Sequence, residues 1–137
     1  MEDATPHELP FTLPLRVYFE DTDAGGIVYH ARYLYFLERA RTEWLRELGF
    51  NQSELQKQDV VFVIRDMQIK WQAPARLDDE LLVSVRVDRI KNASMVMSQT
   101  ITSGNVTHVS ATVTIACLQG STMKPMAIPQ EIIRVAK

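Results

Sequence analysis

The hydrophobic period of the chain changes at Tyr33 and again after Leu48, and this change most constrains the fold. Between these residues apolar side chains recur every three or four positions, as on one face of a helix. On both sides of the segment, apolar and polar residues alternate, which is typical of strands with one buried face. At ~1.5 Å per residue the helix would be about 24 Å long, and Gly49 is typical of the residue after a helix end. The sequence therefore predicts one long helix between strands.

The alternating segments define the rest of the fold. The first strand is predicted over residues 15–20, with Leu15, Val17 and Phe19 on its inner face. Four more strands are predicted over residues 60–71, 83–88, 95–101 and 109–117, the first of them long enough to bend. Short turns at residues 91–93 and 104–105 join the last three strands. This order predicts an α+β fold, a five-stranded antiparallel sheet packed on a single helix.

A single helix leaves much of such a sheet uncovered. It covers part of one face, so the second face and the edge strands stay open to another chain. We therefore expect a homo-oligomer, either a dimer or a tetramer.

Length and charge limit the function classes. The chain has 137 residues, 46% of them apolar, which is enough for one core but too little for two. We expect a flexible tail over residues 1–12, without the pattern of a signal peptide, and a single domain over residues 13–137. The formal net charge of −2 argues against nucleic acid as a partner. No apolar run is long enough for an integral membrane segment.

The cysteine and histidine content argues against a disulfide or a metal site. Cys117 is the single cysteine, which excludes an intramolecular disulfide and fits a reducing compartment such as the cytoplasm. It lies on the same face of its strand as Val113 and Ile115, so we expect a buried, inert thiol. The three histidines, which include His108 and His7, are scattered without the spacing of metal ligands. We expect no metal and no cofactor.

The loop between the first strand and the helix carries the candidate chemistry. Residues 21–30 read DTDAGGIVYH, and they lead to a helix start, where backbone N–H groups lack partners within the helix. The two glycines permit unusual backbone angles and a close approach of a ligand. Taken alone, Asp21 or Asp23 is more simply explained as a cap of a turn or of the helix. A calcium loop is excluded because Arg32 stands where a bidentate glutamate is required.

A longer stretch around this loop resembles a known family. Residues 19–41, FEDTDAGGIVYHARYLYFLERAR, are similar to the signature of hotdog-fold acyl-CoA thioesterases, the group of 4-hydroxybenzoyl-CoA thioesterase, and most of all to its YbgC branch. The resemblance extends from Leu13 to about Pro129. It implies a five-stranded antiparallel sheet wrapped around one long central helix, with subunits joined edge to edge. The predicted order of elements agrees with this fold.

The resemblance also implies roles for residues of the loop. The catalytic carboxylate of the family falls on Asp23, and the amide that faces the thioester carbonyl falls near His30. Asp23 would act either as a general base or as a nucleophile, while amides at the helix start stabilise charge on the carbonyl oxygen. Asp21 is assigned to the structure of the loop. Residues expected to bind the substrate are Gly26, Ile27, Tyr29 and His30.

Several other residues can be interpreted as either functional or structural. Tyr29 and His30 could instead pack locally at the helix start, and His30 could orient water or the carboxylate. Glu38 matches a helix glutamate that is catalytic in other hotdog branches, but with Asp23 present a supporting or surface role is favoured. Six cationic residues could bind coenzyme A phosphates or simply lie on solvated strand faces. They are Arg65, Lys70, Arg76, Arg86, Arg89 and Lys91.

These inferences predict a cytoplasmic acyl-CoA thioesterase. It would release a carboxylic acid and a thiol from acyl-CoA or from acyl carrier protein, and the resemblance implies a link to the Tol-Pal envelope system. The alternative is a hotdog module that binds acyl thioesters or acyl carrier protein without hydrolysis. A carboxylate at Asp23 favours the enzyme, since binding alone does not require it.

Overall fold

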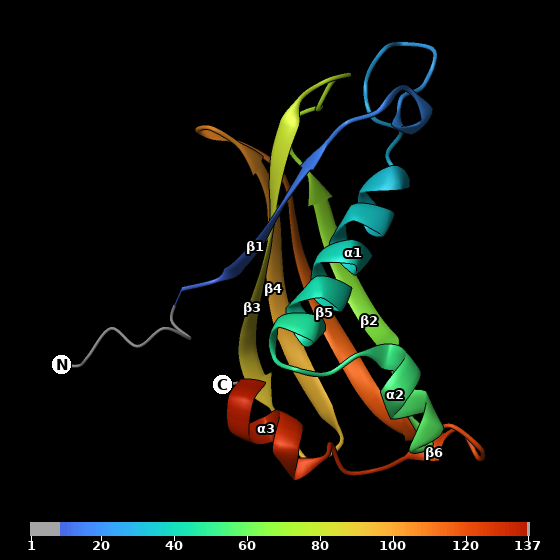
Figure 1. Ribbon diagram of the computed structural model, residues 1–137. Coiled ribbons are helices and arrows are strands. Elements are labelled where there is room, and N and C mark those ends of the chain that lie inside the picture. The colour runs from blue at the N-terminus through green and yellow to red at the C-terminus, as the bar shows by residue number, and fades with distance from the viewer. Residues whose placement is uncertain (1–8, 137) are drawn as a thin grey trace, which may run out of the picture.

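A computed structural model describes residues 9–136 and contains one six-stranded antiparallel sheet with three helices (Figure 1). Neighbouring strands follow the order β1-β3-β4-β5-β2, and a short β6 pairs with β5. The strands are β1 Phe11–Arg16, β2 Val60–Trp71, β3 Glu80–Ile90, β4 Ser94–Ser103, β5 Val106–Gln119 and β6 Lys124–Pro125. The helices are α1 Arg32–Glu47, α2 Gln52–Lys57 and α3 Gln130–Ala136. The five long strands agree with the predicted sheet, to which the two-residue β6 is added.

Helix α1 lies along the sheet and supplies one side of the core (Figure 1). Its buried residues recur at the predicted spacing and include Tyr33, Phe36 and Leu37 in the first half of the helix. They pack in one cluster with buried sheet residues such as Val83 and Met97. The prediction of one long helix is confirmed within one residue at each end. Gly49 follows the helix with a φ of 99°, a left-handed angle that favours glycine.

Strand β2 is long and bent, as its sequence predicts. It pairs with β5 over its whole length, but the register shifts between Ile64 and Asp66. Such a shift leaves one residue without an opposite partner and bends the strand. Strand β2 stands at one end of the strand order, so its outer edge has no partner strand within residues 9–136.

The first strand lies earlier in the chain than predicted. Strand β1 begins at Phe11 and pairs with β3, so Phe11 and Thr12 belong to the sheet and not to a tail. Leu9 and Pro10 precede the strand, and residues 1–8 of the predicted tail lie outside the described residues. Val17 is fully buried as predicted, but Phe19 sits in a 3-10 turn and is 81% exposed. The alternation ends early because the Asp21 carboxylate accepts a hydrogen bond from the Tyr18 backbone N–H and closes the turn.

Helices α2 and α3 were not predicted. The first is six residues long and mostly polar, with Leu55 as its buried residue, so it shows no clear period. It is defined by its cap, because the Asn51 side chain accepts a hydrogen bond from the Glu54 backbone N–H. Helix α3 buries Ile132 and Ala136 against the core. In the part of the chain that the structure describes, no helix has the length and apolar character needed to cross a membrane.

Candidate active site

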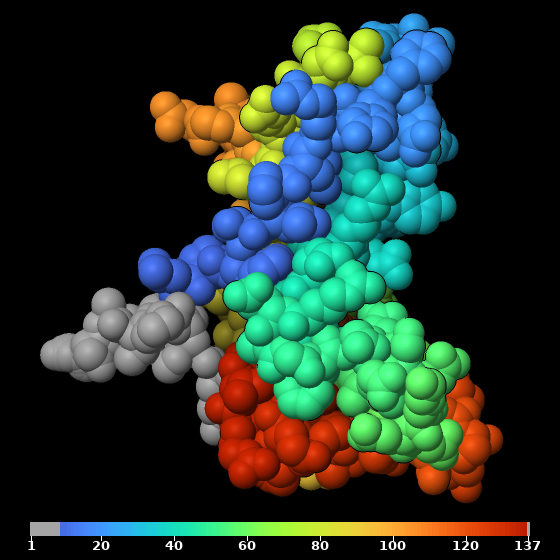
Figure 2. Space-filling model, viewed as in Figure 1, coloured from blue at the N-terminus to red at the C-terminus, as the bar shows by residue number. Residues whose placement is uncertain are grey.

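Residues 21–30 fold back on themselves before α1 begins. Thr22 and Val28 form an isolated antiparallel bridge, and the Asp23 backbone N–H donates to the Ile27 carbonyl at 2.9 Å. The turn is closed by the Gly26 backbone N–H, which donates to the Asp23 carbonyl at 3.0 Å. Gly26 has a φ of 81°, which side chains with a Cβ rarely adopt. The loop is therefore held in one conformation at the start of α1 (Figure 2, blue above cyan).

Asp21 is buried and holds the base of this loop. One of its carboxylate oxygens accepts from the Tyr18 backbone N–H at 2.8 Å, and the other lies 3.0 Å from Nε of Arg32. Its backbone carbonyl accepts from the Tyr29 N–H at 2.9 Å. A cation at the first position of a helix is unfavourable, and the Asp21 carboxylate offsets it. Asp21 therefore has the structural role that the sequence predicts.

Asp23 is exposed, in contrast to Asp21 two residues earlier. Its Oδ1 accepts a hydrogen bond from the Gly25 backbone N–H at 2.8 Å. Within residues 9–136, the second carboxylate oxygen has no hydrogen-bond or ion-pair partner. A Cβ at position 25 would lie 3.3 Å from Oδ1, so a glycine there leaves space for the carboxylate. One oxygen of Asp23 is thus fixed, and the other is available for chemistry.

The backbone just before α1 offers free hydrogen-bond donors. Among the described residues, the N–H groups of His30 and Ala31 donate to no protein acceptor. Helix α1 begins at the next residue, Arg32, and its N-cap residue, Ala31, provides no side-chain hydrogen bond to the helix. Such donors at a helix start attract negative charge. They lie seven and eight positions after Asp23, at the other end of the folded loop.

Aromatic side chains hold this end of the loop against β2. The Trp71 indole N–H donates to the His30 carbonyl at 3.0 Å, and the rings of these two residues meet edge to face at 6.0 Å. The Tyr29 ring lies 4.5 Å from that of His30 and is half exposed. The hydroxyl of Tyr33 accepts from the Ala75 backbone N–H at 3.1 Å. Tyr29 and His30 are thereby brought together at the surface beside the end of β2.

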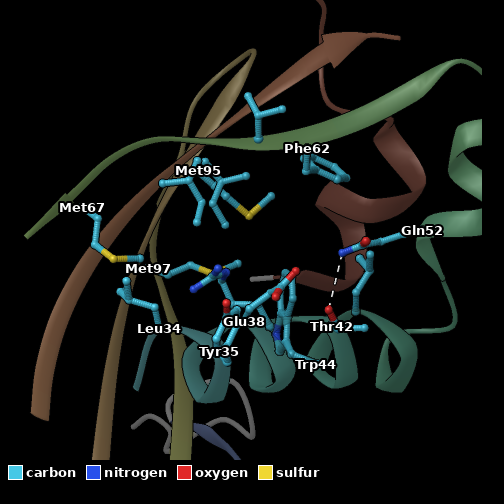
Figure 3. Close-up of a pocket in the computed structure, with 15 residues that line it drawn as sticks. Leu34, Tyr35, Glu38, Thr42, Trp44, Gln52, Phe62, Met67, Met95 and Met97 are labelled. Atoms are coloured by element: carbon cyan, nitrogen blue, oxygen red, sulfur yellow. Dashed lines mark hydrogen bonds between the residues drawn. The ribbon is translucent and has the colours of Figure 1, made fainter. Parts of the chain in front are cut away.

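A cavity of about 570 Å³ lies between α1 and the sheet, and we call it the α1 chamber (Figure 3). Leu34 and Tyr35, from the first turn of α1, line it, so the chamber begins beside the loop. Charged side chains in its lining come from Glu38 and Arg41. Its apolar wall consists mainly of Leu34, Phe62, Met67, Met95, Met97 and Ile115.

The predicted substrate-binding residues do not line this chamber. Gly26, Ile27, Tyr29 and His30 all belong to the loop outside it. The chamber itself was not predicted, although the sequence holds one signal for it. Leu34 widens the apolar stripe of the helix beyond the face that packs on the core, and it lines the chamber together with Arg41 and Leu45.

The other reactive residues are committed to structure. Cys117 is fully buried, its Sγ lies 3.9 Å from the Ala127 carbonyl, and burial raises the pKa of the thiol. The ring of His108 is hydrogen-bonded on both nitrogens, to the Ser103 hydroxyl at 2.6 Å and the Ala73 carbonyl at 2.9 Å. In residues 9–136, no three His, Cys, Asp or Glu side chains are grouped as metal ligands.

An antiparallel sheet curled on one long helix, with a folded acidic loop at the helix start, defines a hotdog-fold protein. The chain belongs to the thioesterase-like superfamily, whose family model matches residues 17–135. The acyl-CoA thioesterase YbgC of Haemophilus influenzae is 46% identical over 123 residues, which cover 89% of this chain and 90% of the relative. Within the superfamily, the chain is therefore a thioesterase of the YbgC type.

Further comparisons agree with this placement. The acyl-CoA thioester hydrolase YbgC of Escherichia coli is 45% identical over 124 residues, covering 90% of this chain and 92% of the relative. A crystal structure of a probable thioesterase from Bartonella henselae superposes with a TM-score of 0.84 at 39% identity. That superposition covers 88% of this chain and 100% of the other. The resemblance read from residues 19–41 is thus confirmed over nearly the whole domain.

Proposed function

We propose that the protein hydrolyses acyl-CoA thioesters, with Asp23 as the catalytic residue and the N–H groups of His30 and Ala31 as the donors to the carbonyl oxygen. The observation that carries this proposal is the folded loop itself. Counting partners among residues 9–136 alone, it holds an exposed carboxylate with one free oxygen at one end and two unpaired backbone donors at the other. Charge that develops on a thioester carbonyl is stabilised by donors of this kind.

The reaction needs a water molecule and the Asp23 carboxylate. As a general base, Asp23 takes a proton from water while the hydroxide adds to the carbonyl carbon; the carbon–sulfur bond then breaks and the thiolate takes up the proton. As a nucleophile, Asp23 adds to the carbonyl carbon itself, expels the thiolate and forms an anhydride that water then cleaves. A single turnover in ¹⁸O-water separates these routes, because the nucleophilic route can leave ¹⁸O in the Asp23 carboxylate.

The α1 chamber is the proposed place of the acyl chain. It begins at the first turn of α1, directly after the donors of the loop. Its wall is largely apolar, and Met67, Met95 and Met97 are flexible side chains that adapt to the shape of a ligand. Gly26, Ile27, Tyr29 and His30 would then contact the thioester and the thiol side of the substrate at the surface.

The carrier of the acyl group would lie outside the chamber. All six candidate phosphate ligands are exposed, and Arg76 is the one whose backbone pairs with the loop, through its bridge to Ile27. A guanidinium at this place can bind the phosphates of coenzyme A or of the phosphopantetheine group of acyl carrier protein.

Replacing Asp23 by asparagine tests the catalytic assignment. The amide has the same shape but cannot accept a proton or act as an anionic nucleophile, so we expect kcat to fall by at least about a hundredfold, with acyl-CoA affinity little changed. Thiol release from acyl-CoA measures kcat, and calorimetric titration with a non-hydrolysable thioether analogue measures affinity. Glu20→Gln removes another exposed carboxylate nearby and serves as the control.

The same experiment decides between the two candidate functions. A module that binds acyl thioesters without hydrolysing them would show no turnover in the wild-type protein on coenzyme A or acyl carrier protein substrates. Turnover that persists unchanged in Asp23→Asn would instead reject Asp23 as the catalytic residue.

The apolar surface beside the chamber supports a homo-oligomer. Ile64 and Trp71 on β2, and Leu34 and Tyr35 on α1, are large apolar side chains that are between 38% and 53% exposed. Leu34, Tyr35 and Ile64 line the α1 chamber together, and the outer edge of β2 has no partner strand within residues 9–136. A second copy that pairs along β2 would cover them and extend the sheet. The cytoplasmic location, the tetramer and the link to the Tol-Pal system stay proposals that rest on the family resemblance.

A further inference from the structure

A half-buried cation lines the α1 chamber. Nη1 of Arg41 donates a hydrogen bond to Oε1 of Gln99 at 2.9 Å. Gln99 is 1% exposed, and its Nε2 donates to the carbonyls of Leu37 and Ser84, each at 3.1 Å. The amide of Gln99 is thus fixed between α1 and the sheet, and its oxygen fixes the guanidinium. The Arg41 side chain is therefore preorganised in the chamber and does not sample many rotamers in solvent.

The guanidinium of Arg41 also has N–H donors that the contact with Gln99 does not use. A guanidinium carries five N–H donors, and the contact with Gln99 uses one of its nitrogens. Among residues 9–136 no carboxylate oxygen lies within 4.0 Å of Arg41. Glu38, one turn earlier on α1, is the acidic group that acts on it and also lines the chamber. Burial lowers the pKa of Arg41 and Glu38 raises it, with burial the larger effect.

The chamber therefore offers a donor group and an acceptor group within apolar walls. A plain alkyl chain would cover the guanidinium without replacing the water that solvates its free donors, which is costly. A carboxylate would pair with Arg41 but would meet the like charge of Glu38. A hydroxyl both accepts and donates, so it can accept from Arg41 and donate to Glu38 at no electrostatic cost.

We propose that Arg41, together with Glu38, is a specificity determinant that selects acyl groups with a hydroxyl on the distal part of the chain. This inference rests on the proposed function, since it assigns the acyl group to the α1 chamber. The Gln99 side chain contacts both Arg41 and the Leu37 carbonyl, so this carbonyl marks the position of the guanidinium along the helix. Leu37 lies five residues after the start of α1, about 7–8 Å along the helix axis. A hydroxyl next to the thioester carbonyl is too close to the helix start to reach this pair, whereas a distal one can.

The test compares octanoyl-CoA with its ω-hydroxy and ω-carboxy analogues. For the wild-type protein we expect kcat/KM to be roughly tenfold higher for the ω-hydroxy chain than for the alkyl chain, with the ω-carboxy chain below the ω-hydroxy chain. Arg41→Met should bring the ratio of ω-hydroxy to alkyl kcat/KM close to one. Arg39→Met removes the neighbouring cation, which does not line the chamber, and should keep the wild-type ratio.

A second variant keeps the test decisive if Arg41→Met does not fold. Glu38 is exposed, so Glu38→Gln should fold, and it should raise kcat/KM for the ω-carboxy chain relative to the ω-hydroxy chain. Equal rates for alkyl and ω-hydroxy chains in the wild type overturn the inference and leave the thioesterase intact. A preference that survives both Arg41→Met and Glu38→Gln overturns it as well. Absence of turnover on all three chains overturns this inference, and absence of turnover on acyl-CoA and acyl carrier protein substrates of every chain length overturns the proposed function.

Discussion

At the scale of single residues, two aspartates in one loop have opposite environments. Asp21 is 4% exposed and is bound by the Tyr18 N–H and by Arg32, whereas Asp23 is exposed and one of its oxygens has no partner in the described part of the chain. The same residue type can hold a fold or carry out chemistry, and the surroundings decide which. The sequence identifies both aspartates, but its preference for Asp23 comes from the family resemblance.

Asp21→Asn tests whether Asp21 stabilises the fold while Asp23 does not. The change leaves the partly buried guanidinium of Arg32 without a negative partner, so we expect the free energy of unfolding to fall by about 1–3 kcal/mol. Asp23→Asn should change it by less than about 0.5 kcal/mol, because the side chain is exposed. Urea denaturation of both variants measures the difference. Equal losses of stability would show that Asp21 does not hold the loop.

At the scale of elements, two polar contacts join helix α1 to the rest of the fold at defined positions along the helix. The Tyr33 hydroxyl accepts from the Ala75 N–H after β2, and Gln99 on β4 donates to the Leu37 carbonyl. Buried polar groups need such partners, since an unpaired one costs about 1–3 kcal/mol. These contacts fix the position of α1 along the sheet, which apolar packing alone specifies less sharply.

The Tyr33 contact predicts how stability depends on pH. Burial raises the pKa of Tyr33 above its usual value of about 10, and this exceeds the lowering by the Ala75 hydrogen bond. The unfolded chain therefore ionises this phenol at a lower pH than the folded protein does. The corresponding stabilisation is complete below pH ~10 and is lost as the pH rises toward the folded-state pKa.

Denaturation between about pH 9 and 11 measures this effect, with Tyr33→Phe as the matched variant. The wild type should lose more stability than Tyr33→Phe over this range. Parallel pH profiles for the two proteins would mean that Tyr33 does not titrate differently in the folded and unfolded states.

At the scale of the whole molecule, the proposed homo-oligomer depends on the edge of β2, which has no partner strand within residues 9–136, and on exposed apolar residues of that strand. Ile64 is 47% exposed at the register shift of β2. A lysine there would place a charge in the proposed interface, so we expect Ile64→Lys to shift the protein from dimer toward monomer. Sedimentation velocity over a range of concentrations measures the shift. Leu82→Lys changes an equally exposed leucine on β3, a strand inside the sheet, and should leave the oligomeric state unchanged.

The sequence by itself determined the long helix, the bent strand β2, the hairpins and the acidic loop. Each of these is encoded locally, because the spacing of apolar residues states which side of an element is buried. The early start of β1 at Phe11 escaped prediction. The exposure of Phe19 also escaped it, because the Asp21 carboxylate accepts a hydrogen bond from the Tyr18 backbone N–H and closes a turn where the sequence pattern still alternates. Helix α2 was missed for a similar reason, since a cap defines it more than a period does.

Only the tertiary structure decided where the α1 chamber lies and which charged groups face it. The chamber lies between α1 and the sheet, and its wall combines Leu34, Met67 and Met97 from three distant segments. The position of Arg41 depends on Gln99, fifty-eight residues later in the chain. The hydrophobic period predicts that a residue faces inward. It does not predict whether other side chains fill the space in front of that residue or leave a cavity there.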